Sequence, residues 1–259
     1  MALELRLDDA VVLVTGGVRG VGAGITRAFL LAGARVVTCA RTEPENPLPG
    51  AAFLRCDVRE PESVEWLIDE VRRTYGRLDV LVNNAGGAPF ADAASASPRF
   101  HAKVVALNLL APLNLARAAN AVMQHQEAGG SIVNISSVSG TRPSPGTVSY
   151  GAAKAGLDNL TSTLAIEWAP KVRVNALDVG MVRTELAQLH YGGEDAVAAV
   201  GATVPLGRLA EPDEIGACAV FLASPLASYV SGARLAVHGG GEVPAFLAAS
   251  SAALGKEPV

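Results

Sequence analysis

Tyr150 and Lys154 are the residues whose types and spacing point most directly to chemistry. They lie four positions apart in a segment with helical periodicity, so both side chains share one face of a helix. A phenol with a pKa of about 10 exchanges protons poorly at neutral pH, but a neighbouring ammonium group favours the phenolate and lowers that pKa. A pKa of about 7 requires roughly 4 kcal/mol of differential stabilisation, which Lys154 would share with a further cation. The pair indicates proton exchange, although Tyr and Lys at this spacing are also common for structural reasons.

Ser137 and Asn108 are two further polar candidates. Ser137 lies thirteen residues before Tyr150, in the turn predicted after a strand at 131–135. Both hydroxyl groups would then lie at the carboxyl edge of one sheet, where Ser137 could hydrogen-bond a substrate oxygen. A serine in a turn ordinarily bonds the local backbone instead. Asn108 lies inside a long predicted helix, which asparagine disfavours mildly, so its side chain would cap a kink or bind a water.

A glycine-rich turn follows the first predicted strand. The strand at 11–14 runs into Thr15-Gly16-Gly17-Val18-Arg19-Gly20-Val21-Gly22, and a helix follows. Glycines at 16, 20 and 22 permit a tight turn and bring main-chain N–H groups and the positive helix end close to a pyrophosphate. The spacing is GxxxGxG rather than GxGxxG, and such turns also occur for packing alone. Its place at the start of a βαβ series favours dinucleotide binding.

The end of the second predicted strand indicates which dinucleotide is bound. An acidic residue there would hold a ribose 2'-hydroxyl, but this chain has Ala40 and Arg41. Arg41 and Arg19 could instead clamp a 2'-phosphate, because guanidinium groups bind phosphate oxygens in bidentate fashion. We therefore predict NADP(H) in preference to NAD(H), which stays the alternative. The competing interpretation is that both arginines are solvated surface charges.

Short β-branched runs alternate with longer helical patterns over most of the chain. The predicted strands cover 11–14, 35–39, 80–82, 131–135, 172–176 and 235–237, and the predicted helices cover 61–75, 100–126, 149–168 and 213–222 besides one that ends at Gly33. This alternation predicts an α/β fold, a Rossmann-type doubly wound parallel sheet with helices on both faces. Residues 1–242 are expected to form a single cofactor-binding and catalytic domain, with a substrate loop near 184–207 and a C-terminal tail at 243–259.

Composition narrows the possible classes of protein. The chain has 259 residues, of which 50% are hydrophobic, and a net charge of -4, so neither a disordered chain nor a nucleic-acid partner is expected. Three widely spaced cysteines and four histidines without metal-ligand spacing predict neither a disulfide framework nor a metal site. The sequence has no basic leader and no run approaching roughly 18 apolar residues, so we expect no membrane span and a cytoplasmic location.

Taken together, these motifs closely resemble the short-chain dehydrogenase/reductase family, in its branch of about 250 residues with a YxxxK active site. The resemblance covers nearly the whole chain. It rests on TGxxxGxG at 15–22, NNAG at 83–86, Asn108, Ser137 and YxxxK at 150–154, with weaker matches at Asp57-Val58, Gly207-Arg208 and the segment from Leu235.

The resemblance implies a role for each matched residue. Ser137 would position the substrate oxygen, and Tyr150 would be the general acid/base. Lys154 would tune Tyr150 and bind the nicotinamide ribose, while Asn108 would hold a water of the proton relay. The residues implied in cofactor binding are Gly16, Arg19, Gly20, Val21, Gly22, Arg41, Asp57, Val58, Asn84, Ala85, Gly86, Tyr150, Lys154, Val182 and Thr184.

One departure from the family pattern lies after the strand at 172–176. The chain has Val179-Gly180 where the family usually has Pro-Gly. Loss of the proline frees φ and adds a backbone donor, so we expect a more mobile loop and a less secure cofactor contact there.

The leading hypothesis is an NADP(H)-dependent oxidoreductase that transfers hydride between the cofactor and a secondary alcohol/ketone substrate. The alternatives are an NAD-dependent alcohol dehydrogenase of the same family and a non-catalytic cofactor-binding regulator. Tyr191 and His190 are candidate substrate contacts. The family is typically dimeric or tetrameric through the catalytic helix, where small residues such as Ala152 and Ala155 permit close approach, so we expect a homotetramer, with a dimer next.

Overall fold

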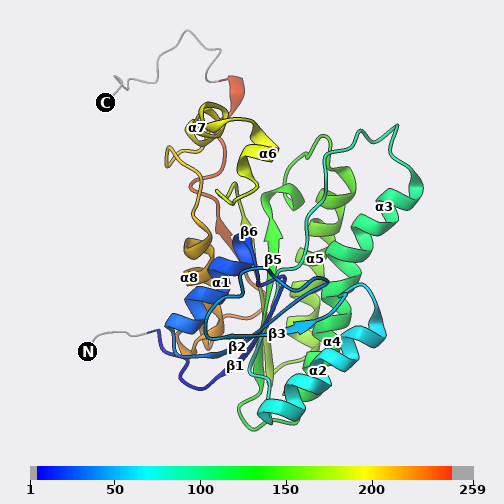
Figure 1. The fold of residues 1–259 in the computed structure, drawn as a ribbon, viewed down its shortest axis with the longest axis vertical. Coiled ribbons are helices and arrows are strands. Elements are labelled where there is room, and N and C mark those ends of the chain that lie inside the picture. The colour runs from blue at the N-terminus through cyan, green and yellow to red at the C-terminus, as the bar shows by residue number, and fades with distance from the viewer. Residues whose placement is uncertain (1–4, 247–259) are drawn as a thin grey trace.

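Seven parallel strands form the central sheet of the computed structural model, which describes residues 5–246 except for the side chains of residues 189 and 190 (Figure 1). They are β1 (Val11–Thr15), β2 (Arg35–Ala40), β3 (Ala51–Arg55), β4 (Val80–Asn83), β5 (Gly130–Ser137), β6 (Val172–Val179) and β7 (Arg234–Val237). Their order across the sheet is β3-β2-β1-β4-β5-β6-β7. The chain reverses direction across the sheet between β1 and β4, which confirms the predicted doubly wound α/β class.

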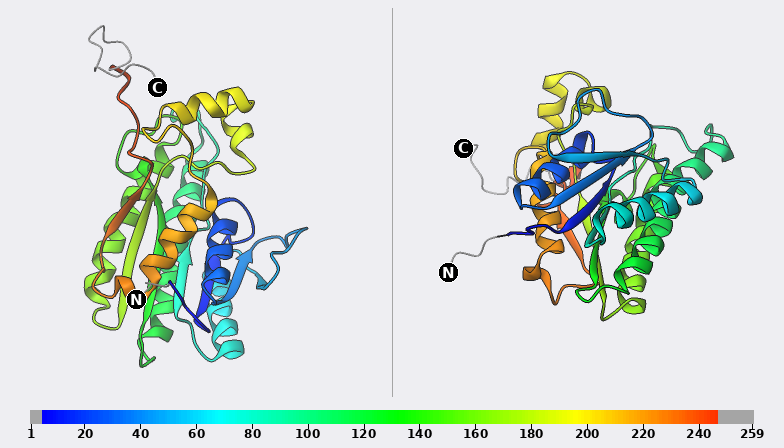
Figure 2. Two further views of the ribbon diagram at one scale, coloured as in Figure 1. Left: turned by 90° about the vertical axis from the view of Figure 1, so that its left-hand side faces the viewer. Right: turned by 60° about the horizontal axis from the view of Figure 1, so that its bottom comes forward.

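Helices cover both faces of this sheet (Figure 2). α1 (Gly20–Leu31) and α8 (Pro212–Ala223) pack on one face, while α2 (Pro61–Tyr75), α4 (Ala111–Met123) and α5 (Val148–Glu167) pack on the other. Val12 and Val14 of β1 belong to the first of these cores, and Val11 and Leu13 belong to the second. A strand that is buried on both faces is apolar throughout, which is why 11–14 reads as a continuous hydrophobic run.

The sequence patterns do not predict β3. It is short, reads Ala-Ala-Phe-Leu-Arg, and lies at the edge of the sheet, where none of its five residues is fully buried. Its pairing with β2 begins at Val36↔Ala51. An edge strand of this length lacks the apolar run of an interior strand, so hydrophobic periodicity does not reveal it.

The prediction of one unbroken helix at 100–126 is wrong. The structure has α3 (Pro98–Val105), a π-helical turn (Ala106–Leu110) and then α4. Pro112 explains the interruption, because its ring lacks an N–H and would clash with the carbonyl four residues earlier in a regular α-helix.

This helical run also corrects the expectation that no segment approaches the length and apolar character of a membrane span. Residues Pro98–Met123 are long and apolar enough, by length and a mean hydropathy of 1.2, to meet the criterion for a membrane span. Leu115, Ala119 and Met123 of α4 are buried in the core against the sheet. Core packing therefore accounts for the apolar character of these three positions, whereas 39% of the apolar window as a whole is buried.

Two short helices stand beyond the carboxyl ends of the strands (Figure 1). α6 (Ala187–Tyr191) and α7 (Glu194–Ala202) lie within the segment 184–207 that was expected to form a substrate loop. Single 3-10 turns at Val138–Gly140 and Pro225–Ala227 complete the elements of the described chain. The side chain of His190 and most of the predicted tail, residues 247–259, lie outside the described residues.

Candidate active site

The carboxyl ends of β1, β4 and β5 bring the predicted site residues together. β1 leads into the glycine-rich turn, β4 leads into Asn84, Ala85 and Gly86, and β5 ends at Ser137. A side chain built on Gly16 would come within 3.1 Å of Ala85, and one built on Gly86 would come within 3.5 Å of Lys154 Nζ. Segments more than sixty positions apart in the chain therefore meet at one edge of the sheet.

Ser137 and Tyr150 lie within hydrogen-bonding contact of each other, and this contact acts to lower the pKa of Tyr150. Burial of the phenol is the larger effect, so the pKa of Tyr150 is raised from its ordinary value. The lowered pKa predicted from the neighbouring lysine is therefore wrong for the chain alone. Ser137 is the last residue of β5 rather than a turn residue, and its Oγ also accepts a hydrogen bond from Ser139 N at 3.2 Å.

Lys154 is buried directly below Tyr150 on α5. Its Nζ donates to the carbonyl of Ile135 at 2.7 Å and lies 5.5 Å from the centroid of the Tyr150 ring. Burial lowers the pKa of Lys154 to about 8, while the charge of Asp158 acts in the opposite direction. The amine therefore stays mostly protonated at neutral pH, but its pKa lies much closer to 7 than that of an exposed lysine.

Asn108 lies in the π-helical turn, where its side chain is fully buried. Its Oδ1 accepts from Gly87 N at 2.8 Å, and its Nδ2 donates to the carbonyls of Gly87 at 3.0 Å and Val104 at 2.8 Å. The side chain thus joins the kink of the helix to the loop after β4. The sequence suggested that this side chain would either cap a helix kink or bind a water. In the structure its hydrogen bonds are those of a residue at a kink.

The glycine-rich turn fits an anion. Gly16 and Gly20 adopt positive φ values of 65° and 51°, and a side chain on Gly22 would lie 2.1 Å from the carbonyl of Gly16. Asn84 Nδ2 braces the turn from β4 by donating to the carbonyl oxygens of Thr15 at 2.9 Å and Gly16 at 3.2 Å. α1 has no acidic residue in its first turn and no side-chain cap, so its positive end is left for an anion from outside the helix.

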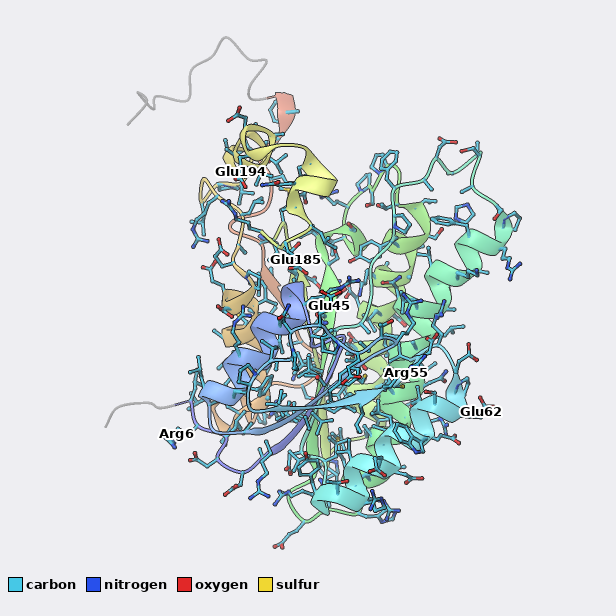
Figure 3. All side chains as sticks on the ribbon, in the orientation of Figure 1. Arg6, Glu45, Arg55, Glu62, Glu185 and Glu194 are labelled. Carbon is cyan, nitrogen blue, oxygen red and sulfur yellow. The ribbon has the colours of Figure 1, made fainter. Side chains whose placement is uncertain are left out.

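A carboxylate already contacts this helix end. Glu185 Oε2 accepts a hydrogen bond from Gly20 N at 3.2 Å, and Figure 3 shows Glu185 beside the start of α1. Glu185 and Thr184 also line a cavity of about 390 Å³ below α6 and α7. The N–H group of Gly20 therefore binds a carboxyl oxygen of the chain itself in this structure, and pyrophosphate binding at this turn stays a prediction.

A family model described as enoyl-(acyl carrier protein) reductase matches residues 16–242, which include the turn, the braced loop and the Tyr–Lys pair. The chain belongs to the short-chain dehydrogenase/reductase family. It is accordingly an oxidoreductase that acts on CH–OH groups with NAD(P) as acceptor. The resemblance stated from the sequence motifs is confirmed.

Relatives within this family include sugar and polyol dehydrogenases. The chain is 39% identical over 255 residues to L-fucose dehydrogenase of Bos taurus, covering 94% of this chain and 93% of the relative. It is 37% identical over 248 residues to D-threitol dehydrogenase of Mycolicibacterium smegmatis, covering 92% and 94%. The ligand-free aldohexose dehydrogenase of Thermoplasma acidophilum superimposes with a TM-score of 0.85 at 31% identity, covering 91% of this chain and 94% of that one.

Arg19, which precedes α1, and Arg41, which follows β2, are both exposed. The backbone carbonyl of Arg41 accepts from Arg55 Nε at 3.0 Å, whereas neither the Arg19 nor the Arg41 guanidinium forms a hydrogen bond or ion pair within the described chain. Asp57 is held by Arg59 through Nε at 2.9 Å and Nη2 at 2.5 Å, which is the main reason that its pKa is lowered. Sequence reasoning missed the ion pair of Arg59 with Asp57, although a basic residue two positions after an acidic one can form such a pair.

Val179 lies in β6, not in the loop expected from its departure from the family's Pro-Gly. It is buried and pairs with Ser137 of β5 and Val237 of β7. Gly180 N continues the ladder by donating to Val237 O at 3.0 Å. A residue with a free N–H extends the strand where proline would end its pairing, so the predicted strand end at 176 is three residues too early.

A buried amide network supports the strand ends and was missed by sequence reasoning. Asn83 Nδ2 donates to Asn134 Oδ1 at 2.9 Å and to Pro112 O at 3.2 Å, and Asn134 Nδ2 donates to Thr161 Oγ1 at 2.9 Å. The network joins β4, β5, α4 and α5, so it fixes the helix that carries Tyr150 and Lys154. Val182 pairs in an isolated bridge with Ala210, and a side chain built on Gly20 would come within 3.5 Å of Thr184.

Within residues 5–246, no group of three or more His, Cys, Asp or Glu side chains is arranged to hold a metal ion.

Proposed function

We propose that this chain is an NADP(H)-dependent oxidoreductase that transfers hydride between the cofactor and a secondary alcohol/ketone pair. The observation that carries the proposal is the meeting of Ser137, Tyr150 and Lys154 at the sheet edge beside the glycine-rich turn. Residues 1–242 form the cofactor-binding and catalytic domain in this proposal, and the protein acts in the cytoplasm.

In alcohol oxidation, the bound nicotinamide supplies the hydride acceptor and a positive charge. Tyr150 Oη takes the hydroxyl proton of the substrate, and Ser137 Oγ hydrogen-bonds the substrate oxygen. Lys154 supplies positive charge below the phenol, which favours the phenolate that accepts this proton. In carbonyl reduction the same Oη returns the proton. Because burial alone raises the pKa of Tyr150, the charge of the cofactor and that of Lys154 must both act on it.

The cofactor would be held by the residues that the family motifs identify. Gly16, Gly20, Val21 and Gly22 would hold the pyrophosphate at the start of α1, with Thr184 above them. Asp57 and Val58 would contact adenine, and Asn84, Ala85, Gly86 and Val182 would line the nicotinamide half. Glu185 must leave Gly20 when the pyrophosphate binds, since both use the same N–H group.

We further propose a polyol or monosaccharide as the substrate class. The named relatives act on fucose, threitol and aldohexose, which are all rich in hydroxyl groups. The segment between Ser137 and Tyr150 is polar as well: its Arg142 pairs with Glu242, and its Ser144 Oγ and Thr147 Oγ1 lie 2.6 Å apart. Charged and hydroxyl side chains of this kind recognise hydroxyl groups through paired hydrogen bonds.

A substrate panel tests this proposal. The oxidation rate should be measured with L-fucose, threitol, glucose and simple secondary alcohols, each with NADP⁺ and with NAD⁺. We expect the highest kcat/KM for a polyhydroxylated substrate with NADP⁺. A preference for NAD⁺ would favour the NAD-dependent alternative, and cofactor binding without turnover of any substrate would favour the regulator.

Replacing Arg41 by alanine is expected to weaken NADP⁺ binding about 10-fold to 100-fold, because a charge-assisted hydrogen bond to phosphate contributes about 1.5–3 kcal/mol. NAD⁺ lacks the 2'-phosphate, so its Kd should change little. Both constants can be measured by fluorescence titration. The matched control is Arg117→Ala, which removes an exposed arginine paired with Glu65 on the α2–α4 side. An equal loss for both cofactors would contradict the assignment of Arg41.

We also propose self-association through α5. Ala152, Ala155 and Ile166 on this helix are exposed, and Ile166 is 82% accessible. Small residues on an exposed helix face permit two helices to approach closely across a symmetry axis, and an exposed apolar side chain on the same helix is buried by such a contact. Light scattering at micromolar concentration should give the mass of a homotetramer, or of a dimer, and a monomeric mass would contradict the proposal.

A further inference from the structure

A pair of buried carboxyl groups lies directly behind Lys154. Asp158 follows Lys154 by four positions on α5, so Tyr150, Lys154 and Asp158 form a row at steps of four residues along one helix face. Asp178 faces this helix from β6, in register with Ser136 of β5. The two carboxyl groups are 3% and 7% exposed. Neither belongs to the motifs that define the active site.

The hydrogen bonding of this pair requires a proton. The two carboxyl groups are close enough to share a hydrogen bond, yet Oδ1 of Asp158 and Oδ1 of Asp178 have no partner atom within the described chain. Two ionised carboxylates are both acceptors only and cannot bond each other. A single proton shared between the two groups satisfies the contact and removes one of two buried negative charges.

The basic side chains around the two carboxyl groups are consistent with a single negative charge on the pair. Arg234 of β7 reaches Asp158 Oδ2 with Nη1 at 3.4 Å, and His238 lies nearby with a buried Nδ1 that also lacks a partner among the described residues. Burial raises the pKa of Asp178 to about 6, and the charge of Asp158 adds to this, while Arg234 and His238 act in the opposite direction. Asp178 is therefore the member that holds the proton below about pH 6.

We propose that Asp158 is a positioning residue for the reaction: its carboxylate, one helical turn from Lys154, maintains the positive charge of the lysine near Tyr150. This inference rests on the proposed function for its catalytic consequence.

The need for such a counter-charge follows from the surroundings of Lys154. Its Nζ is buried and bonds a neutral carbonyl, so desolvation favours the uncharged amine. Asp158 is the carboxylate whose charge opposes this loss. Gly140 leaves room for it, since a side chain there would lie 3.2 Å from Asp158 Oδ2. Without Asp158 the amine would lose its proton closer to neutral pH, and Tyr150 would lose its cation.

Two isosteric variants separate this role from a merely structural one. In Asp178→Asn the amide donates to Asp158, which keeps its charge beside Lys154. In Asp158→Asn the amide donates to Asp178, so one negative charge remains in the pair but lies on the other residue. Both variants keep one carboxylate and one hydrogen bond, and only the position of the charge relative to Lys154 differs.

The pKa of Lys154 should be measured by NMR titration of its labelled side chain in the cofactor-free protein. We expect a decrease of about one unit in Asp158→Asn, in the lower part of the range for loss of a nearby opposite charge, and little change in Asp178→Asn. An unchanged pKa in Asp158→Asn, or an equal decrease in both variants, would overturn the proposal. This measurement needs no turnover, so it is independent of whether the proposed function holds.

The catalytic readout is the pH profile of kcat/KM for alcohol oxidation. Tyr150 must be deprotonated to accept the substrate proton, so a weaker cation beneath it should move the rising limb to higher pH in Asp158→Asn and leave it in place in Asp178→Asn. If Asp158→Asn shifts the pKa of Lys154 but not the rising limb of the pH profile, the proposed effect on catalysis would be overturned, while the effect of Asp158 on Lys154 would stand.

Infrared difference spectra of the unmodified protein between pH 5 and pH 8 provide a test that no folding defect can affect. We expect the carbonyl stretch of one protonated carboxyl group to disappear with a midpoint near the pKa of about 6 of Asp178. Absence of that band at pH 5 would overturn the shared proton.

Discussion

Replacing Tyr150 by phenylalanine is expected to lower kcat/KM for alcohol oxidation about 1,000-fold, within the range typical of lost general acid–base catalysis. The variant keeps the ring that lies 5.5 Å from Lys154 Nζ and loses only the hydroxyl that exchanges the proton and contacts Ser137. Initial rates with saturating NADP⁺ measure the effect. Fluorescence titration of the same variant should show a cofactor Kd within about threefold of wild type, since only one hydroxyl is lost and the other cofactor-binding residues are retained.

Tyr75→Phe is the matched control for this variant. Tyr75 is the last residue of α2, packs against the core on the side of the sheet that α2 covers, and takes no part in the site. Its loss of a hydroxyl should leave kcat/KM nearly unchanged. A rate in Tyr150→Phe within tenfold of wild type would show that another group exchanges the proton.

Replacing Gly22 by alanine is expected to reduce the free energy of unfolding by about 2–3 kcal/mol and to weaken cofactor binding at least tenfold. A Cβ atom there would lie 2.1 Å from the carbonyl oxygen of Gly16 and 2.5 Å from Asn84 Nδ2. The first of these is backbone, so the glycine-rich turn itself must move. That turn both closes the β1–α1 connection and presents the N–H groups for the pyrophosphate. Urea unfolding and cofactor titration measure the two effects.

Gly193→Ala is the control for the added methyl group. A Cβ atom on Gly193, which precedes α7, would meet nothing within 4 Å. We expect a change in unfolding free energy of less than about 1 kcal/mol and no change in cofactor Kd. Equal behaviour of the two alanine variants would mean that close approach at Gly22 does not shape the turn.

Local signals account for the parts of the fold that the sequence predicts well. The helix at 61–75 is predicted at its observed bounds because Pro61 occupies its first turn and Gly76 ends it with a positive φ of 77°. The spacing of Tyr150 and Lys154 places both on one helix face, as observed. Such features depend on a few neighbouring residues, so they are visible without the tertiary structure.

Contacts between distant segments could not be predicted in the same way. Asp158 and Asp178 come from a helix and a strand, and only the register of β6 brings their carboxyl groups together. The contact of Glu185 with Gly20 spans 165 residues. Burial also reversed the expected direction of the Tyr150 pKa, because a desolvation effect depends on everything packed around the phenol. These features belong to the assembled sheet edge and leave no mark in local spacing.

Deuterium transfer tests the central claim most directly. An alcohol of the preferred class, labelled with deuterium at the carbinol carbon, should be oxidised with NADP⁺, and the isolated cofactor analysed by mass spectrometry and NMR. We predict one deuterium on the nicotinamide ring for each ketone formed, and a rate about 1,000-fold lower in Tyr150→Phe. Binding of NADP⁺ without label transfer from any alcohol, or transfer to NAD⁺ alone, would contradict the account.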